Sequence, residues 1–130
     1  IYAGWINAAQ IKVILELSDV GLAPYVHTKN FTENVPNKPA EYLSEKLLIA
    51  TSLEYGKLFD LIKQEECGLS YGENPNKLAS FLETLKKDSN ELKRLKVNAE
   101  NLFNRDFDGN KVYNSMINFL ENLTVRNSAY

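Results

Sequence analysis

Two glutamates, Glu33 and Glu41, flank a polar turn that includes Asn37 and Lys38. Where such a turn leads into a helix, the first backbone N–H groups have no partner within the helix, and the helix dipole adds partial positive charge. A helix start of this kind can bind a phosphate or diphosphate, to which Lys38 would add a mobile positive charge. Glu41, about one turn further in, is too deep for the phosphates but within reach of a sugar hydroxyl, which can donate to a carboxylate oxygen. The residue types therefore allow a site for a phosphate-linked sugar.

The same residues also have a purely structural interpretation. Asn37 is predicted to be the N-cap of the helix, and Pro39 is tolerated in the first turn because its missing N–H needs no partner there. A strand-to-helix loop of any α/β protein ends in a capping residue, and a glutamate in the first turn favours the dipole without a ligand. Spacing alone leaves an anion site and an ordinary capped loop both open.

Three short apolar runs, at residues 19–25, 47–51 and 68–71, predict strands, and residues 1–4 look like the end of another. The runs are nearly continuous rather than alternating, which favours strands that are covered on both faces, as in a parallel sheet. Segments with helical spacing lie between them, so the chain is predicted to form an α/β sheet with right-handed crossovers. The polar stretch at residues 25–42 begins at the carboxyl end of the first strand, where open α/β sheets bind their ligands.

The second half of the chain is predicted to be mostly helical. Asn74–Pro75 is typical of a helix start, a second helix begins at Ser89 or Asn90, and Asp108–Gly109 interrupts the pattern before a third helix. We expect the apolar stripes of these helices to be core faces that cover the sheet, and a groove for a partner is the alternative. The stripe of the third helix consists of Val112, Met116, Ile117, Leu120 and Leu123.

Composition limits the class of protein. The 130 residues suffice for one domain, and fifteen Lys and Arg against seventeen Asp and Glu leave no basic excess for nucleic-acid binding. There is no signal-peptide layout and no apolar run near the roughly 20 residues that span a bilayer, so we expect a cytoplasmic protein. One cysteine, Cys67, and one histidine, His27, cannot form a disulfide framework or a Cys- or His-rich metal site. We interpret Cys67 as a buried small side chain and His27 as an ordinary loop residue, with a reactive thiol and a proton shuttle as alternatives.

Residues 31–44 resemble the donor-binding motif of retaining glycosyltransferases of family 4, which have the GT-B fold. That motif is a pair of glutamates with seven residues between them, here Glu33 and Glu41. The likeness continues on both sides in the order of the family, and an ordered set is more specific than the pair alone. The further matching segments are residues 2–5, 18–25, 47–52, 67–71 and 74–79.

The resemblance implies roles for individual residues. Glu33 would be catalytic, contacting hydroxyls of the transferred sugar, and Glu41 would hydrogen-bond the ribose of the nucleotide. Trp5 and Ile6 would lie against the base. The donor would be a UDP- or GDP-linked sugar, which is a substrate and not a cofactor, and no metal is implied. The diphosphate and sugar would face the backbone of Asn34, Val35, Pro36, Asn37 and Lys38.

The resemblance also implies a parent enzyme that transfers a hexose with retention of configuration, in the synthesis of bacterial surface polysaccharide or glycoconjugates. The parent enzyme would lie in the cytoplasm or peripherally at the inner face of the cell membrane. The match departs from the family at Asn34 and Pro36, where glycines are common, and at residues 45–48, which replace a small-Gly-x-Pro turn. The Asn-Lys-Pro sequence after Pro36 resembles the subset that acts in surface-polysaccharide assembly.

On this view residues 1–125 form part of a GT-B donor domain that lacks its first two strands, and residues 126–130 form a frayed tail. The acceptor domain would be missing, so the chain alone would not transfer sugar. In the strand order 3-2-1-4-5-6, the strand around residues 20–24 becomes an open edge that could pair with a second copy. Residues 54–57 follow the next strand and could also reach the donor. The alternatives are a non-catalytic phosphate- or nucleotide-binding α/β module and a structural fragment without ligand affinity.

Overall fold

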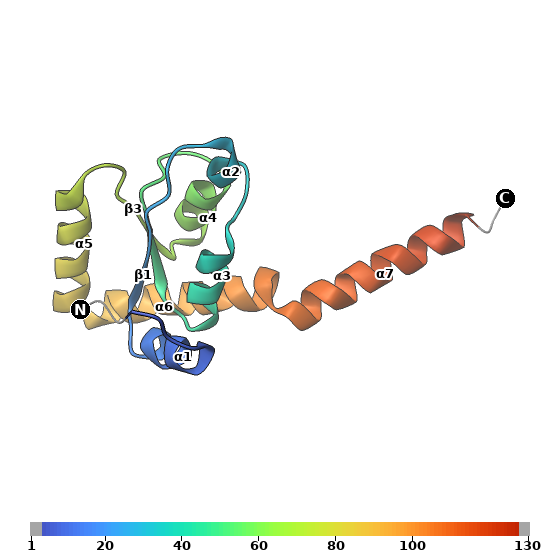
Figure 1. The fold of residues 1–130 in the computed structure, drawn as a ribbon, viewed down its shortest axis with the longest axis horizontal. Coiled ribbons are helices and arrows are strands. Elements are labelled where there is room, and N and C mark those ends of the chain that lie inside the picture. The colour runs from blue at the N-terminus through green and yellow to red at the C-terminus, as the bar shows by residue number, and fades with distance from the viewer. Residues whose placement is uncertain (1–3, 128–130) are drawn as a thin grey trace.

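The computed structural model describes the backbone of residues 4–127 and the side chains of residues 4–123. Three parallel strands form one sheet in the order β1-β2-β3, with Val20 opposite Leu48 and Ile49 opposite Gly68 (Figure 1). The α/β class and the parallel sheet are therefore confirmed. Residues 1–3 of the further expected strand lie outside the described residues, and Gly4 belongs to no strand. The strands are β1 (Val20–Ala23), β2 (Leu48–Thr51) and β3 (Gly68–Ser70).

Local signals account for where several helices begin. The Asn74 side chain accepts hydrogen bonds from the first turn of α5, with Pro75 as its first residue, and Asp88 caps α6 in the same way. Gly56 precedes α4 with φ 98°, a conformation that other residues rarely adopt. The helices are α1 (Ala8–Glu16), α2 (Lys29–Thr32), α3 (Asn37–Ser44), α4 (Lys57–Glu65), α5 (Pro75–Lys87), α6 (Ser89–Leu102), the π-helical turn η1 (Phe103–Phe107) and α7 (Gly109–Asn127).

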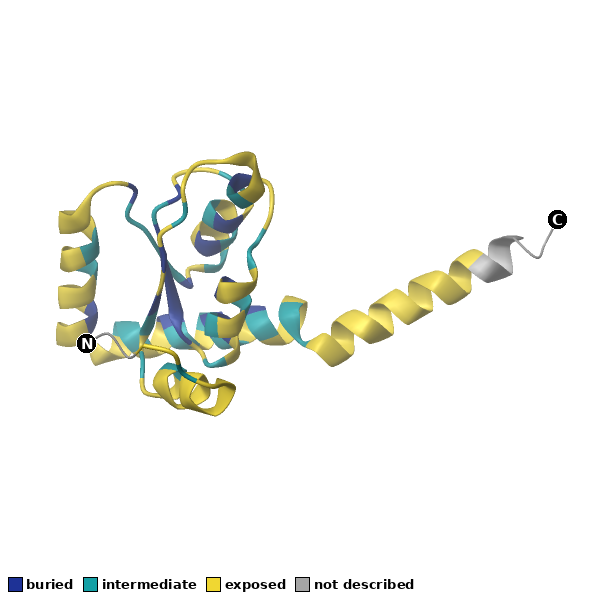
Figure 2. Ribbon diagram, in the orientation of Figure 1, coloured by how far each residue is buried: buried dark blue, intermediate teal, exposed yellow. Residues whose placement is uncertain are grey.

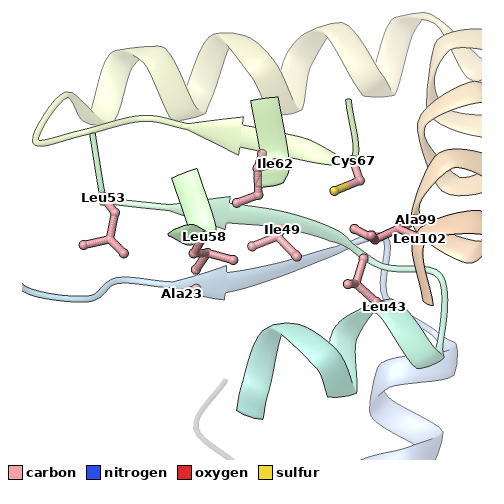
Figure 3. Packing of buried hydrophobic residues seen from close by; sticks show 9 residues of the cluster. All are labelled: Ala23, Leu43, Ile49, Leu53, Leu58, Ile62, Cys67, Ala99 and Leu102. Atoms are coloured by element: carbon pink, nitrogen blue, oxygen red, sulfur yellow. The ribbon is translucent and has the colours of Figure 1, made fainter. Parts of the chain in front are cut away.

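The core lies between the sheet and helices α3, α4 and α6 (Figure 3). Ile49 of the central strand β2 is fully buried among side chains from all three of these helices. Cys67 is buried in this cluster, which confirms its interpretation as a packed small side chain. A second cluster, around Leu48, Leu85 and Leu95, packs α5 and α6 on the other face of β2. The residues drawn as sticks in Figure 3 are Ala23, Leu43, Ile49, Leu53, Leu58, Ile62, Cys67, Ala99 and Leu102.

Salt bridges join the end of α4 to the helices that cross beneath it. Arg105 of η1 lies 2.8 Å from Glu65, and Arg94 of α6 lies 2.6 Å from Glu66. These partners are largely exposed, and such surface pairs contribute little to the free energy of unfolding.

The prediction that the third apolar stripe is a core face is wrong for the part of α7 whose side chains are described. Met116, Ile117 and Leu120 are each about half exposed, and Figure 2 shows α7 exposed along that length and directed away from the sheet. The reason is local, because the backbone at Asp108 is extended and the chain turns outward after η1. The helix continues to Asn127, so it includes two of the five residues that we expected to fray.

Helix α1 is also peripheral. None of its residues is buried, and Ile11 and Ile14 of its apolar stripe are exposed. Its first turn is held by a reciprocal pair of hydrogen bonds between Asn7 and Gln10, each side chain accepting from the other's backbone N–H. Local capping, more than tertiary packing, therefore stabilises this helix.

Candidate functional site

The loops that follow the three strands are tied together at the carboxyl edge of the sheet. The Ser52 hydroxyl donates to the carbonyl oxygen of Tyr25 at 2.6 Å, which joins the loops after β2 and β1. The Ser70 hydroxyl donates to the carbonyl oxygen of Leu53 at 2.7 Å, which joins the ends of β3 and β2. Short side-chain bonds to buried or half-buried carbonyls restrict loop movement, so this edge is a preformed rim.

His27 forms a third tie in this rim. Its Nε2 accepts a hydrogen bond from the backbone N–H of Glu54 at 3.2 Å, and its ring lies against the ring of Tyr55 with centroids 5.2 Å apart. An accepting Nε2 places the proton of the neutral imidazole on Nδ1. The contact gives His27 a role in joining two loops, in line with its interpretation as an ordinary loop residue.

Helix α2 was not expected from the sequence, and it fills the space beside the start of α4. A Cβ atom on Gly56 would collide with the carbonyl oxygen of Thr32, so the backbone of α2 lies directly against that glycine. The first turn of α4 therefore faces protein backbone rather than open space. Of the two helix starts that were expected to reach a nucleotide-sugar donor, the start of α3 is the more open.

The start of α3 differs by one residue from the expectation. Pro36, not Asn37, occupies the N-cap position, with φ −64° and ψ 163°, and no side chain caps the first turn. The fixed φ of proline suits an extended N-cap, and Pro39 takes the third helical position, where its missing N–H is no loss. Asn37 and Lys38 are exposed, and within the described residues their backbone N–H groups have no hydrogen-bond partner. This turn thus has the open amides that an anion would require.

Glu33 and Glu41 are both exposed, and neither carboxylate forms a hydrogen bond or an ion pair with the residues that the structure describes. Glu33 is the C-cap of α2, and Glu41 lies in the middle of α3. Burial is the main cause that raises the pKa of Tyr25 and Tyr42, and the negative charge of Glu41 raises both further. The charge of Glu41 therefore acts on both tyrosine hydroxyls, one in the loop after β1 and one in α3.

The residues between these carboxylates are placed by the core and by α2. Val35 is half-buried, and its side chain packs against the main core cluster. The side-chain Nδ2 of Asn34 donates to the backbone carbonyl oxygen of Asn30 at 3.3 Å, which ties the turn to the preceding helix, α2. The rings of Tyr25, in the loop after β1, and Phe31, in α2, are stacked with their centroids 4.6 Å apart. This contact joins the rim to the helix that directly precedes Glu33.

Trp5 and Ile6 are not brought together with these residues. They directly precede α1, which lies beside the amino ends of the strands, whereas α2 lies at the opposite end of the sheet (Figure 1). The Trp5 side chain is fully exposed and Ile6 is half-buried. The arrangement therefore gives no support to a base-binding surface at these two positions.

Tyr42 is a residue of this region that the sequence analysis did not identify. Its hydroxyl donates to the carbonyl oxygen of Leu22 at 2.9 Å, across twenty positions of the sequence. A Cβ atom on Gly21 would overlap the Tyr42 ring, so the glycine allows the ring to lie directly on β1. Among the described residues β1 is an edge strand, as expected, but one of its acceptors is already bonded within the chain. A glycine inside an apolar run is the signal that could have indicated this close approach.

Three hollows formed by the described residues are lined by none of residues 33–41. No three metal-ligating side chains in the part of the chain that the structure describes are placed to hold a metal ion together. The helices described here are all too short or too polar to cross a bilayer. Comparison of the chain with protein-family models, curated proteins and solved structures found no match.

Proposed function

We propose that the start of α3 binds the diphosphate of a nucleotide-sugar donor, as the resemblance to retaining family 4 glycosyltransferases implies. The observation that supports the proposal is the exposed and uncapped first turn at Asn37 and Lys38, with unpaired carboxylates at Glu33 and Glu41 on either side of it in the sequence. Open amides and a positive dipole end favour an anion, and carboxylates favour hydroxyl donors. A diphosphate esterified to sugars carries both kinds of group.

In this proposal each residue has one task. The amides of Asn37 and Lys38, with the Lys38 ammonium, hold the diphosphate and stabilise the charge that grows on it as it leaves. Glu41 accepts from the ribose hydroxyls, and Glu33 accepts from hydroxyls of the transferred sugar. In the reaction of the parent enzyme, the bond from the anomeric carbon to the diphosphate oxygen breaks, and a bond to the oxygen of an acceptor hydroxyl forms on the same face of the sugar. The proton of that hydroxyl passes to the departing diphosphate. Acceptor binding is not assigned to any residue described here.

The test is a titration of the isotope-labelled chain, followed by the backbone amide signals of Asn37 and Lys38 in NMR spectra. UDP-glucose and GDP-mannose are the donor probes, with inorganic pyrophosphate and free glucose for comparison. We expect at least one donor to shift these two amides at millimolar concentration or below. No shift with either donor or with pyrophosphate would overturn the proposal.

Three variants separate the parts of the site. Lys38→Gln should weaken both donor and pyrophosphate binding, whereas Glu41→Gln should weaken only the donor, by roughly three- to tenfold, because a charged acceptor is replaced by a neutral one. Glu83→Gln, on the exposed face of α5, is the matched control and should change neither. Equal binding of pyrophosphate and donor, unaffected by Glu41→Gln, would favour the alternative of a phosphate-binding module without sugar transfer.

A further inference from the structure

A groove of about 310 Å³ runs along β3 on the side away from β2. Helix α4 contributes Phe59, Ile62 and Lys63, the three residues of β3 line it, and α5 contributes Lys77. No residue of the proposed donor site lines this groove, so it is a second, separate feature of the surface.

The outer edge of β3 has backbone groups available for pairing. The carbonyl oxygen of Cys67 accepts from the N–H of Ile49, and the N–H of Tyr71 donates to the carbonyl oxygen of Thr51, so residues 67 and 71 face β2. Because alternate residues of a parallel strand bond to the same neighbour, Gly68 and Ser70 direct their N–H and C=O groups away from β2. Among the described residues no strand lies on that side.

The two edges of the sheet differ in this respect. At β1 the hydroxyl of Tyr42 already donates to the carbonyl oxygen of Leu22, which faces outward because Asp19 and Ala23 bond toward β2. Nothing comparable occupies the edge of β3 within the described residues. An added strand would therefore meet a free edge at β3 and a partly occupied one at β1.

The charges of the groove indicate what kind of strand it would accept. Lys63 and Lys77 approach it from different helices, α4 and α5, and neither forms a salt bridge with any described residue. Lys63 also lies over the ring of Phe59, with its Nζ 5.9 Å from the centroid. The groove thus combines apolar surface from Phe59, Ile62 and Leu69 with two unpaired cations that come from helices on opposite faces of the sheet. It is complementary to an extended apolar segment that carries one acidic side chain on each of its two faces.

We propose that the open edge of β3 binds an extended acidic peptide segment of a partner protein as a fourth strand. Main-chain hydrogen bonds to Gly68 and Ser70 supply the pairing, and carboxylates that reach Lys63 and Lys77 supply the preference for acidic sequences. With only three residues in β3, the paired segment is short, so the complex is a weak one.

The experiment uses the intact chain and a capped peptide of sequence Val-Glu-Val-Val-Glu-Val, whose two glutamates lie on opposite faces of an extended strand. NMR titration should shift the amide signals of residues 68–70 and slow hydrogen exchange at Gly68 and Ser70. The peptide Val-Lys-Val-Val-Lys-Val, and the acidic peptide methylated at its backbone nitrogens, should each bind at least fivefold more weakly, since one loses the charge match and the other the hydrogen bonds.

Charge reversal in the protein provides the second arm. Lys63→Glu and Lys77→Glu should each weaken the acidic peptide by roughly three- to tenfold, as expected for an exposed charge pair converted to repulsion. Lys93→Glu, an exposed lysine of α6 outside the groove, is the matched control and should leave binding unchanged. These exposed sites should tolerate substitution, which thermal unfolding of each variant would verify.

Equal binding of the acidic and basic peptides would overturn the proposal, as would shifts confined to β1. Equal binding of the methylated peptide would overturn strand pairing, leaving only an apolar groove. Concentration-dependent shifts at residues 68–70 without any peptide would overturn it in favour of a second copy of the chain as the occupant.

Discussion

Helices α4 and α7 are both amphipathic, yet only α4 buries its apolar face against the sheet. In α4 the apolar side chains of Leu58 and Ile62 are buried against the sheet. In α7, which is about twice as long, Met116 and Leu120 remain about half exposed (Figure 2). An apolar stripe therefore indicates that one face of a helix favours burial, but it does not indicate whether other parts of the same chain bury that face.

The difference comes from the turns at the ends of these helices. The chain leaves α4 through Glu66, in the left-handed conformation with φ 47°, and returns at once to β3. The chain enters α7 after η1 through Asp108, whose extended backbone directs the helix away from the sheet. Among the described residues α7 makes its main contacts with η1. A reversal of chain direction is what brings the stripe of α4 onto the sheet.

The largest change in the free energy of unfolding is expected when a core side chain of α4 is removed. Leu58 is fully buried in the main cluster, and Leu58→Ala should lower the free energy of unfolding by about 2–5 kcal/mol, because it removes buried surface and leaves a cavity. Chemical denaturation measures it. A loss below about 1 kcal/mol would mean that α4 is not part of the cooperative core.

The stability of the chain at high pH tests whether Cys67 is buried in the same cluster. Burial, with a smaller contribution from the charge of Glu65, raises the pKa of the Cys67 thiol from 9.0 to about 11. Below pH 9 the thiol is protonated in both the folded and the unfolded chain, so burial of the neutral thiol contributes its full stabilisation of the fold. Between pH 9 and 11 only the unfolded chain loses the proton, so the free energy of unfolding falls, by about 2–3 kcal/mol in all.

Cys67→Ala isolates this effect, since the tyrosines titrate in both proteins. Denaturation midpoints measured from pH 8 to pH 11.5 should fall less steeply for the variant than for the parent chain. Parallel curves would show that the thiol is accessible to solvent in the folded state.

A smaller effect is expected at the edge of β1. Tyr42→Phe keeps the ring on Gly21 but removes the hydrogen bond to the carbonyl oxygen of Leu22, which should cost about 1 kcal/mol. Sedimentation of the variant is informative as well, because the freed acceptor should favour any pairing of β1 with a second copy. Unchanged stability would indicate that water replaces the hydroxyl without loss.

The smallest effect is expected in α7. Leu120→Ala, the counterpart of Leu58→Ala, should change the free energy of unfolding of the isolated chain by no more than about 0.5 kcal/mol, because no cavity is formed. The same denaturation experiment measures it. A loss comparable to that of Leu58→Ala would mean that α7 packs against the body in solution and would remove the contrast between the two helices.

Part of the candidate site could be predicted from the sequence. The polar stretch after the first strand indicated the carboxyl edge, and the two glutamates are exposed as a ligand site requires. The cap was assigned one residue late, because an asparagine is the commoner N-cap, whereas here the fixed φ of Pro36 ends the loop. Two contacts depend on how α3 and α2 lie relative to the sheet: that of Tyr42 with β1, and that of the Thr32 backbone with Gly56. No local sequence pattern specifies these positions.

The sequence by itself determined the three strands, the parallel sheet, and the helix starts at Asn74–Pro75 and after Asp108, because propensities, caps and apolar runs act over a few residues. Only the tertiary structure decided that α7 stands clear of the core, that Tyr42 occupies one sheet edge, and that a groove with two lysines follows the other. Burial and edge protection depend on contacts between distant segments, which the direction of each turn sets and a periodic pattern does not.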